Sequence, residues 1–302
     1  MPLNLNIDVK SDSITKLIEA VAKYVEVRHE PEAIVLKAEA EAKASIVLAQ
    51  ADAKNREIAA RTAHRIANLE IRRQDNIESI TAKAVNELPP KVSKEAVSQD
   101  WIARFYEGCQ DVGETDLQQL WGRLLAGEVA QPRTFSRRTM DALRAFSSED
   151  AKVLSQFNSV VFTEINERNF VFVGFGSYQV CDEGIEDIEN HLMSLGLLYT
   201  QKESPPWLTG DWHFCYCGKE YIVPINIWAS MHAGERRTSE MAIRRFTVVG
   251  NELLKLLSRN PDQGFLEDFL KPAFANSQNQ LLTPAEFRKL QEQREKNKRG
   301  SG

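Results

Sequence analysis

The apolar positions between residues 32 and 88 recur every eleven residues. The recurring residues are Leu36, Val47, Ile58, Leu69 and Ile80, and in a second set Ile66 and Ile77. The stretch 33–88 contains neither Gly nor Pro and is rich in helix-favouring Ala, Glu, Lys and Arg. Eleven residues in three turns is about 3.67 residues per turn, which predicts one nearly straight or weakly right-handed, coiled-coil-like helix.

This predicted helix carries an apolar stripe, and the sequence contains no second helix of similar length to cover it. We therefore expect another copy of the chain to pack there, in a ring, tube or bundle. The residues expected at this contact are Leu36, Ala40, Val47, Ala51, Ile58, Ile66, Leu69, Ile77 and Ile80. Because Asn55, His64 and Arg73 interrupt the stripe, two alternatives stay open: a helix folded back onto its own chain, or a solvated single helix.

Shorter helices are expected on both sides of the long one. Residues 1–31 predict a short amphipathic helix that ends near Pro31, and Pro89 ends the long helix of residues 32–88 because proline cannot donate a backbone hydrogen bond. Between residues 89 and 158, helical spacing resumes and is punctuated by turn residues, so we expect a small domain of about four helices.

From residue 159 onward the pattern changes to short β-rich runs. The expected strands are residues 160–162, 170–173, a hairpin within 212–227 that turns near Gly218, and 245–249. Helices are expected from Gly184 to Leu195, ending at Gly196, and from Asn251 to Leu257. The chain is therefore predicted to be mainly α with an α+β domain at residues 159–260, which has an antiparallel, winged-helix-like sheet. A helical or disordered tail is expected over residues 261–302.

Composition narrows the function classes. A formal net charge of −5 creates no general attraction for polyanions, so nucleic acid is not favoured as a partner. Four cysteines are too few for a disulfide framework, and no apolar run is long enough to span a membrane, which favours a cytoplasmic protein. Peripheral membrane contact through residues 11–30 stays an alternative to packing against protein.

One group of side chains could bind a metal ion. His213, Cys215 and Cys217 alternate along a predicted strand, so all three would face the same side. Zinc sites usually space two cysteines further apart, and cysteines in an apolar hairpin are commonly core residues. We expect no cofactor and no catalytic residue, and a motif-poor hydrolase using these three side chains stays an alternative.

The densest basic stretch of the C-terminal part could contact phosphates. It contains Arg236, Arg237, Arg244 and Arg245. These side chains would support a winged-helix-like DNA-binding regulator. Intramolecular salt bridges explain the same residues without nucleic acid.

Three segments together resemble a known bacterial family. They are KAEAEAKA (Lys37–Ala44) with RRQDNIESITAKA (Arg72–Ala84), DLQQLWGRLLAGEV (Asp116–Val129) with FSRRTMDALRAFSSEDAKVL (Phe135–Leu154), and FTVVGNELLKLL (Phe246–Leu257). In that order they resemble the family called domain of unknown function 2806, over most of residues 11–258. The middle segments are also similar, more distantly, to abortive-infection alpha proteins.

The resemblance to abortive-infection alpha proteins implies a role in antiphage defence and supplies no active-site residue. Together with the long helix, it predicts a non-enzymatic, self-assembling protein. Its partners would be other copies of itself and, through the C-terminal domain, a phage or host protein.

Overall fold

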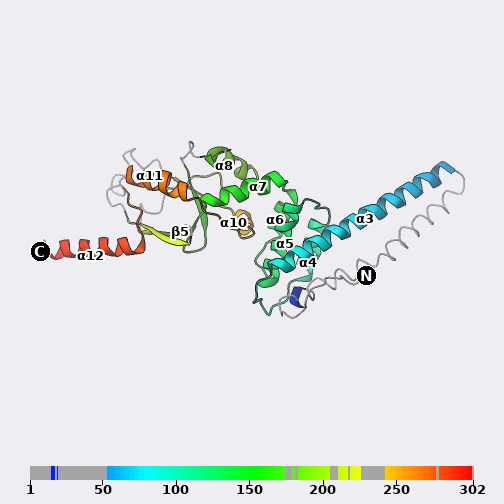
Figure 1. Ribbon diagram of the computed structural model, residues 1–302, viewed down its shortest axis with the longest axis horizontal. Helices are drawn as coiled ribbons and strands as arrows, with labels where there is room; N and C mark the ends of the chain where they lie inside the picture. Colours follow the sequence, from blue (N-terminus) through cyan, green and yellow to red (C-terminus); the bar gives the residue numbers. More distant parts are fainter. Residues whose placement is uncertain are drawn as a thin grey trace. The chain divides into compact units, whose positions relative to one another are not determined.

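The computed structural model describes residues 15–17, 19, 53–173, 179–180, 183–204, 210–216, 218–225, 242–276 and 279–300. The chain divides into two compact units between Ala151 and Lys152, here called unit 1 and unit 2 (Figure 1). Unit 1 is helical, and unit 2 combines helices with a five-stranded antiparallel sheet. The predicted class, helix-rich with an α+β C-terminal half, is confirmed at this level.

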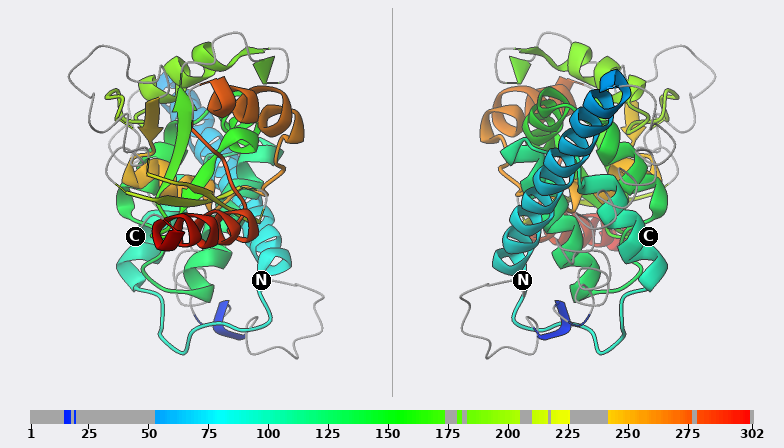
Figure 2. Two further views of the ribbon diagram at one scale, coloured as in Figure 1. Left: turned by 90° about the vertical axis from the view of Figure 1, so that its left-hand side faces the viewer. Right: turned by 90° about the vertical axis from the view of Figure 1, so that its right-hand side faces the viewer.

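Unit 1 is built around one long helix. Its helices are α3 (Ala53–Glu87), α4 (Gln99–Cys109), α5 (Thr115–Ala130), α6 (Arg137–Ala145) and the start of α7 (Ser148–Phe157), and residues 15–17 and 19 are also helical. Figure 2 shows α3 as one straight helix. It ends at Glu87, two residues before Pro89, as the proline predicts. The predicted helical stretch 32–52 lies outside the described residues.

The C-terminal half of α3 packs closely on α5. Ile77, Ile80 and Ala84 are buried there. Gly122 of α5 permits the contact, because a Cβ atom at this position would lie 2.8 Å from the Cβ of Lys83 and 3.1 Å from the backbone nitrogen of Ala84. The N-terminal half of α3 extends past α4, α5 and α6 (Figure 1).

A buried amide sets the register between these two helices. Gln118 Nε2 donates to Asn76 Oδ1 at 3.2 Å and to the Val112 carbonyl at 3.0 Å. Its Oε1 accepts from Ser79 Oγ at 2.7 Å and from Lys83 Nζ at 3.3 Å. Since the amide is both donor and acceptor, it is satisfied without an opposite charge.

The first turn of α7 is closed by a reciprocal cap. Asp150 Oδ2 accepts from the Ser147 backbone nitrogen at 2.8 Å, and Ser147 Oγ accepts from the Asp150 nitrogen at 3.2 Å. This reciprocal pair is a capping box, and it stabilises the first turn of α7.

Unit 2 is organised around its antiparallel sheet. The strands are β1 (Phe162–Glu164), β2 (Asn169–Val173), β5 (Trp212–Tyr216), β6 (Lys219–Val223) and β7 (Ala242–Arg245), in the order β6-β5-β1-β2-β7. A small second sheet pairs β3 (Gln179–Val180) with β4 (Glu183–Gly184). The helical elements are η1 (Asn158–Val160), α8 (Ile185–Ser194), α10 (Val248–Leu254), η3 (Phe265–Leu270), α11 (Lys271–Asn276) and α12 (Pro284–Gly300).

Glycines end two of these elements at the predicted places. Gly196 has a φ of 71° just after α8, and Gly218 has a φ of 70° in the turn between β5 and β6. Only glycine adopts this left-handed region without steric cost, which is why the two positions were recognisable in the sequence.

Two predicted strands were placed wrongly. Val160 lies in the 3-10 helix η1 and the strand begins at Phe162, so the expected strand 160–162 is shifted. The expected strand 245–249 ends at Arg245, and the next helix starts at Val248 rather than Asn251. Thr247 explains this second shift, because its Oγ1 accepts from the Gly250 nitrogen at 3.1 Å and caps the helix despite the β-branched valines that follow.

One face of the sheet is aromatic. It carries Phe162, Phe170, Phe172, Trp212, Phe214 and Tyr216, all buried. Phe265 of η3 and Phe274 of α11 pack against it, with ring centroids 6.2 Å from Phe162 and 5.7 Å from Phe172 respectively. Residues 265–276 of the expected helical or disordered tail are helical, and they complete this core. A π-helical turn at η3 breaks the regular helical spacing and hid this role in the sequence.

Candidate functional site

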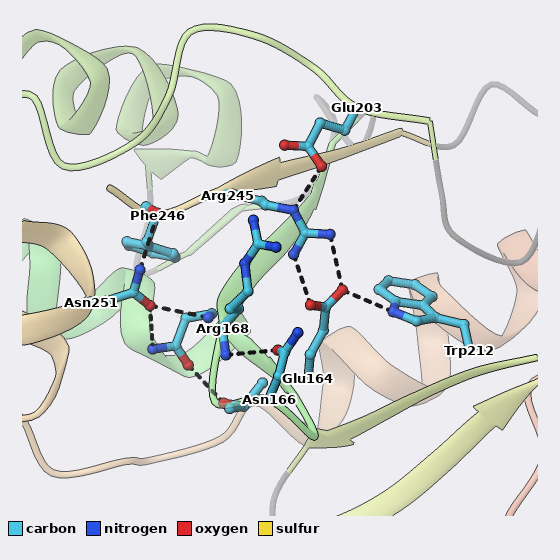
Figure 3. Close-up of polar contacts among 10 residues, drawn as sticks. Glu164, Asn166, Arg168, Glu203, Trp212, Arg245, Phe246 and Asn251 are labelled. Atoms are coloured by element: carbon cyan, nitrogen blue, oxygen red, sulfur yellow. Dashed lines mark hydrogen bonds and ion pairs between the residues drawn. The ribbon is translucent and has the colours of Figure 1, made fainter. Parts of the chain in front are cut away.

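The most polar part of the unit 2 core surrounds Arg245 of β7 (Figure 3). Its guanidinium donates through Nη2 to Glu164 Oε1 at 3.0 Å and through Nε to Glu203 Oε2 at 2.7 Å. Nη1 lies 3.0 Å from Glu164 Oε2, so Glu164 holds the guanidinium with both oxygens. Trp212 Nε1 also donates to Glu164 Oε1, at 3.0 Å.

Electrostatic interactions keep Arg245 charged although it is buried. Burial alone would lower the pKa of Arg245, but hydrogen bonds to Glu164 and Glu203 outweigh the burial and raise the pKa above its ordinary value. Only 7% of the arginine is exposed. A buried ion pair is weak evidence for added stability, because the cost of desolvating the two charges offsets much of their attraction.

Arg244 forms a second buried site on the opposite face of β7. Its Nη1 donates to the carbonyl of Tyr199 at 2.9 Å and to that of Thr200, and its Nε lies 3.5 Å from Glu189 Oε2 of α8. Burial raises the pKa of Glu189 to about 7, while Arg244 acts in the opposite direction. The two arginines point to opposite faces because side chains alternate along a strand.

These contacts correct the predicted phosphate-binding role of Arg244 and Arg245. Only 4% and 7% of the two residues are exposed, and both guanidiniums are occupied by carboxylates or carbonyls of their own chain. The intramolecular alternative is the one that the structure supports. Arg236 and Arg237 lie outside the described residues.

A ladder of asparagines links β2 to α10 beside these pairs. Asn251 Oδ1 accepts from both the backbone nitrogen and Nδ2 of Asn169, at 3.1 and 2.9 Å. Asn251 Nδ2 donates in turn to the carbonyls of Phe246 and Thr247. Each amide is satisfied by its neighbour, so the ladder holds α10 on the sheet and leaves no polar group for a ligand.

Two of the three candidate metal residues, His213 and Cys215, lie on the same face of β5, as their spacing predicts. His213 and Cys215 are both partly exposed, and His213 Nδ1 lies 3.0 Å from Glu220 Oε1 of β6. Cys217 lies outside the described residues. Among the His, Cys, Asp and Glu side chains that the structure describes, no three gather as a set of metal ligands.

The predicted oligomerisation residues fall into two environments along α3. Ile77 and Ile80 are buried against α5 of their own chain, and Leu69 is half-buried. Ile58 and Ile66 are exposed by 46% and 36%. The remaining predicted residues, Leu36, Ala40, Val47 and Ala51, lie outside the described part of the chain.

The carboxylates that hold the two arginines were missed in the sequence. Glu164, Glu189 and Glu203 are spread over three separate segments, and no spacing rule joins them. One signal was available: two adjacent arginines inside an apolar strand must point to opposite faces, so at least one must be buried and needs an acidic partner.

A family model matches part of the chain. The match is to DUF2806, protein of unknown function, over residues 60–204. It confirms the resemblance to this family for that range, which runs from α3 through α8 to the segment that carries Glu203. No curated protein and no solved structure matches the chain. Because the description of DUF2806 states no activity, it transfers no site residue.

Proposed function

We propose that this protein is a non-enzymatic, self-associating protein in which α3 joins copies of the chain and unit 2 recognises a partner. The observation that carries the proposal is the change of environment along α3. Ile80 is 0% exposed and Ile77 is 3% exposed, whereas Ile58 is 46% exposed and Ile66 is 36% exposed. All four belong to the same eleven-residue repeat.

The repeat continues past the place where the described residues of unit 1 cover it. Ile66 and Ile77 are eleven residues apart, and so are Leu69 and Ile80, so each pair points in nearly the same direction from a helix axis. The C-terminal member of each pair packs on α5. The N-terminal members therefore present an apolar surface of the same kind, which another α3 with the same spacing can cover in a coiled-coil-like contact.

Other described helices are poorer candidates for this partner. The next in length, α12, has 17 residues against 35 in α3, and most of its positions are charged or polar. Among the described helices, none is both long and apolar enough to cross a membrane. A second copy of α3 matches the stripe in length and in period, which favours self-association.

A role in antiphage defence is the second part of the proposal. It rests on the similarity of residues 116–154 to abortive-infection alpha proteins and on the self-association proposed for α3. Assembly would concentrate many weak recognition surfaces of unit 2 on one particle and raise their combined affinity for a phage or host protein. The winged-helix-like character of residues 159–260 stays a prediction within this proposal.

Light scattering of the full chain tests the assembly. The variant Ile58→Lys with Ile66→Lys places two charges on the stripe, and we expect it to reduce a defined oligomer to a monomer. The matched control is Ile71→Lys. Ile71 is 60% exposed but lies roughly 140° around the helix from Ile58, so its variant should keep the oligomer. A monomeric wild-type chain, or an unchanged mass in the double variant, would contradict self-association through this stripe.

Phage plating on bacteria that express the chain tests the defence role. We expect wild type to lower plating efficiency, the double lysine variant to lose this protection, and Ile71→Lys to retain it. Equal protection by the double variant would separate defence from assembly. No protection by the wild type against a broad phage panel would contradict the defence role itself.

A further inference from the structure

Residues 199–204, called the strap from here on, run along the outer edge of β7. The Tyr199 nitrogen donates to the Arg245 carbonyl at 3.0 Å. Glu203 and Ile243 exchange two backbone hydrogen bonds, at 2.9 and 3.0 Å. The strap thus pairs with backbone groups of β7 that would otherwise form an open sheet edge.

The pairing contains a bulge. Leu198 is bridged to Phe246 and Glu203 to Ile243, so four residues, 199–202, face only two on β7, 244–245. The two extra residues turn carbonyls away from the strand, and Arg244 Nη1 satisfies those of Tyr199 and Thr200. Arg244 therefore holds the bulge from one face of β7, and Arg245 holds Glu203 from the other.

Hydrophobic burial contributes little to this attachment. Every strap residue is exposed except Glu203, which is half-buried, whereas the preceding Leu197 and Leu198 are buried in the core. Segments with few buried apolar contacts open locally at a lower free energy than the whole domain. Backbone hydrogen bonds and two arginines therefore determine how firmly the strap is held.

Glu189 is the ionisable group behind one of these arginines. Its carboxylate faces Arg244 from β7, Lys202 from the strap and Glu186 from its own helix. Burial raises the pKa of Glu189 to about 7, against the ordinary value of 4.5, and Arg244 and Lys202 only partly oppose this. Arg244 contacts both the strap carbonyls and Glu189, so movement of the strap would open this pair to water and lower the cost of ionising Glu189.

We propose that the strap is a detachable cover whose residues separate from β7 together while the sheet stays folded. We also propose that ionisation of Glu189 weakens the attachment of the strap. Detachment frees the Ile243 nitrogen and the carbonyls of Ile243 and Arg245. These groups fit an extended peptide segment that adds to the sheet as a new strand. None of these groups belongs to α3, so the strap can detach whether or not the chain self-associates.

The direction of the pH effect follows from proton linkage. A pKa of Glu189 that is higher with the strap attached favours the attached state below pH 4.5, and this advantage is lost as the pH rises toward 7. If opening returned the pKa of Glu189 completely from about 7 to 4.5, the opening constant would increase about tenfold between pH 6 and 8, which is the upper limit of the effect.

Native-state hydrogen exchange of the full chain measures this opening. The amides of Tyr199, Glu203 and Ile243 report on the strap, and that of Phe246, which donates to the Asn169 carbonyl inside the sheet, is the reference. After correction for intrinsic exchange rates, we expect the three strap amides to share one opening constant, larger than that of Phe246. It should increase from pH 6 to pH 8, by at most about tenfold.

Two variants test whether Glu189 causes this pH dependence. Glu189→Gln should remove this increase, while Asp187→Asn, which changes an exposed carboxylate on the same helix, should retain it. Strap amides that exchange only as fast as Phe246 would overturn the detachable cover. A pH dependence that persists in Glu189→Gln would overturn the role of that residue, and the wild-type profile decides the first point even if this variant does not fold.

Discussion

The contact between α3 and α5 in unit 1 and the strand β7 in unit 2 both bury polar side chains, but with opposite chemistry. At the first, the amide of Gln118 donates to Asn76 and accepts from Ser79, with Lys83 at the margin. At the second, two guanidiniums are buried against carboxylates and carbonyls. An amide can be satisfied by neutral neighbours, whereas a buried guanidinium keeps its charge and is held here by carboxylates together with backbone carbonyls.

This difference decides how each region responds to change. Removing one partner from a neutral network leaves an unsatisfied dipole, whereas removing one from a buried ion pair leaves an uncompensated charge. The stability of the α3–α5 contact should also be insensitive to pH near neutrality. The stability of the region around the β7 arginines should depend on pH. The following predictions test the comparison, from the largest effect to the smallest.

Arg245→Ala should produce the largest loss. It leaves Glu164 buried without its counter-ion, and we expect the free energy of unfolding of unit 2 to fall by about 3 to 5 kcal/mol. Urea unfolding followed by hydrogen exchange assigns the loss to unit 2. The control is Arg168→Ala, an exposed arginine next to β2, which should change stability by less than about 0.5 kcal/mol. Similar losses in both variants would show that the buried ion pair contributes no more to stability than an exposed arginine does.

Gln118→Leu should have a smaller effect in unit 1. The variant leaves Asn76 Oδ1 and the Val112 carbonyl without their donor, which costs about 2 kcal/mol. The loss should be the same at pH 6 and pH 8. Gln119→Leu, a partly exposed neighbour bonded to Glu87, is the control and should lose clearly less in urea unfolding.

Gly122→Ala tests the close approach of the same two helices. Alanine favours helix over glycine by about 1 kcal/mol, but the added Cβ would lie 2.8 Å from that of Lys83. We expect the clash to exceed the gain and to lower thermal stability by a net of roughly 1 kcal/mol. At Gly113 a Cβ meets no atom within 4 Å, so Gly113→Ala should not destabilise. A stabilised Gly122→Ala would mean that α3 and α5 move apart easily.

The pH dependence of unit 2 should be the smallest effect. Because burial raises the pKa of Glu189 to about 7, its contribution to stability is complete below pH 4.5 and is lost as the pH rises through 7. Unit 2 should therefore be less stable at pH 8 than at pH 6 by about 1 kcal/mol, measured by urea unfolding at both values. In Glu189→Gln the difference should disappear, and a difference of the opposite sign in wild type would contradict the assignment.

Local signals in the sequence predicted much of the secondary structure. The glycines at 196 and 218 and the proline at 89 mark ends that the structure confirms, because each acts through its own backbone geometry. Threonine and valine signals failed at 247–249, where a side-chain cap outweighed the strand preference of the valines. The wrong strand prediction therefore also has a local cause, because helix capping competed with the strand preference of the valines.

The candidate site was much harder to predict. The sequence identified Arg244 and Arg245 as a basic cluster, but their partners lie far along the chain: Glu164 is 81 positions from Arg245. Gln118 and Asn76 are likewise 42 positions apart. Periodicity relates residues a few positions apart and carries no information about such pairs.

By itself the sequence determined the eleven-residue repeat, the end of α3 and the mixed character of the C-terminal half, since these depend on backbone preferences within a few residues. Only the tertiary structure decided which part of the repeat is buried, at Ile77 and Ile80, and which part is exposed, at Ile58 and Ile66. It also showed that Arg244 and Arg245, a basic cluster in the sequence, are buried and hold the strap by hydrogen bonds. The physical reason is that burial and charge pairing depend on which distant segments meet, and packing alone determines that.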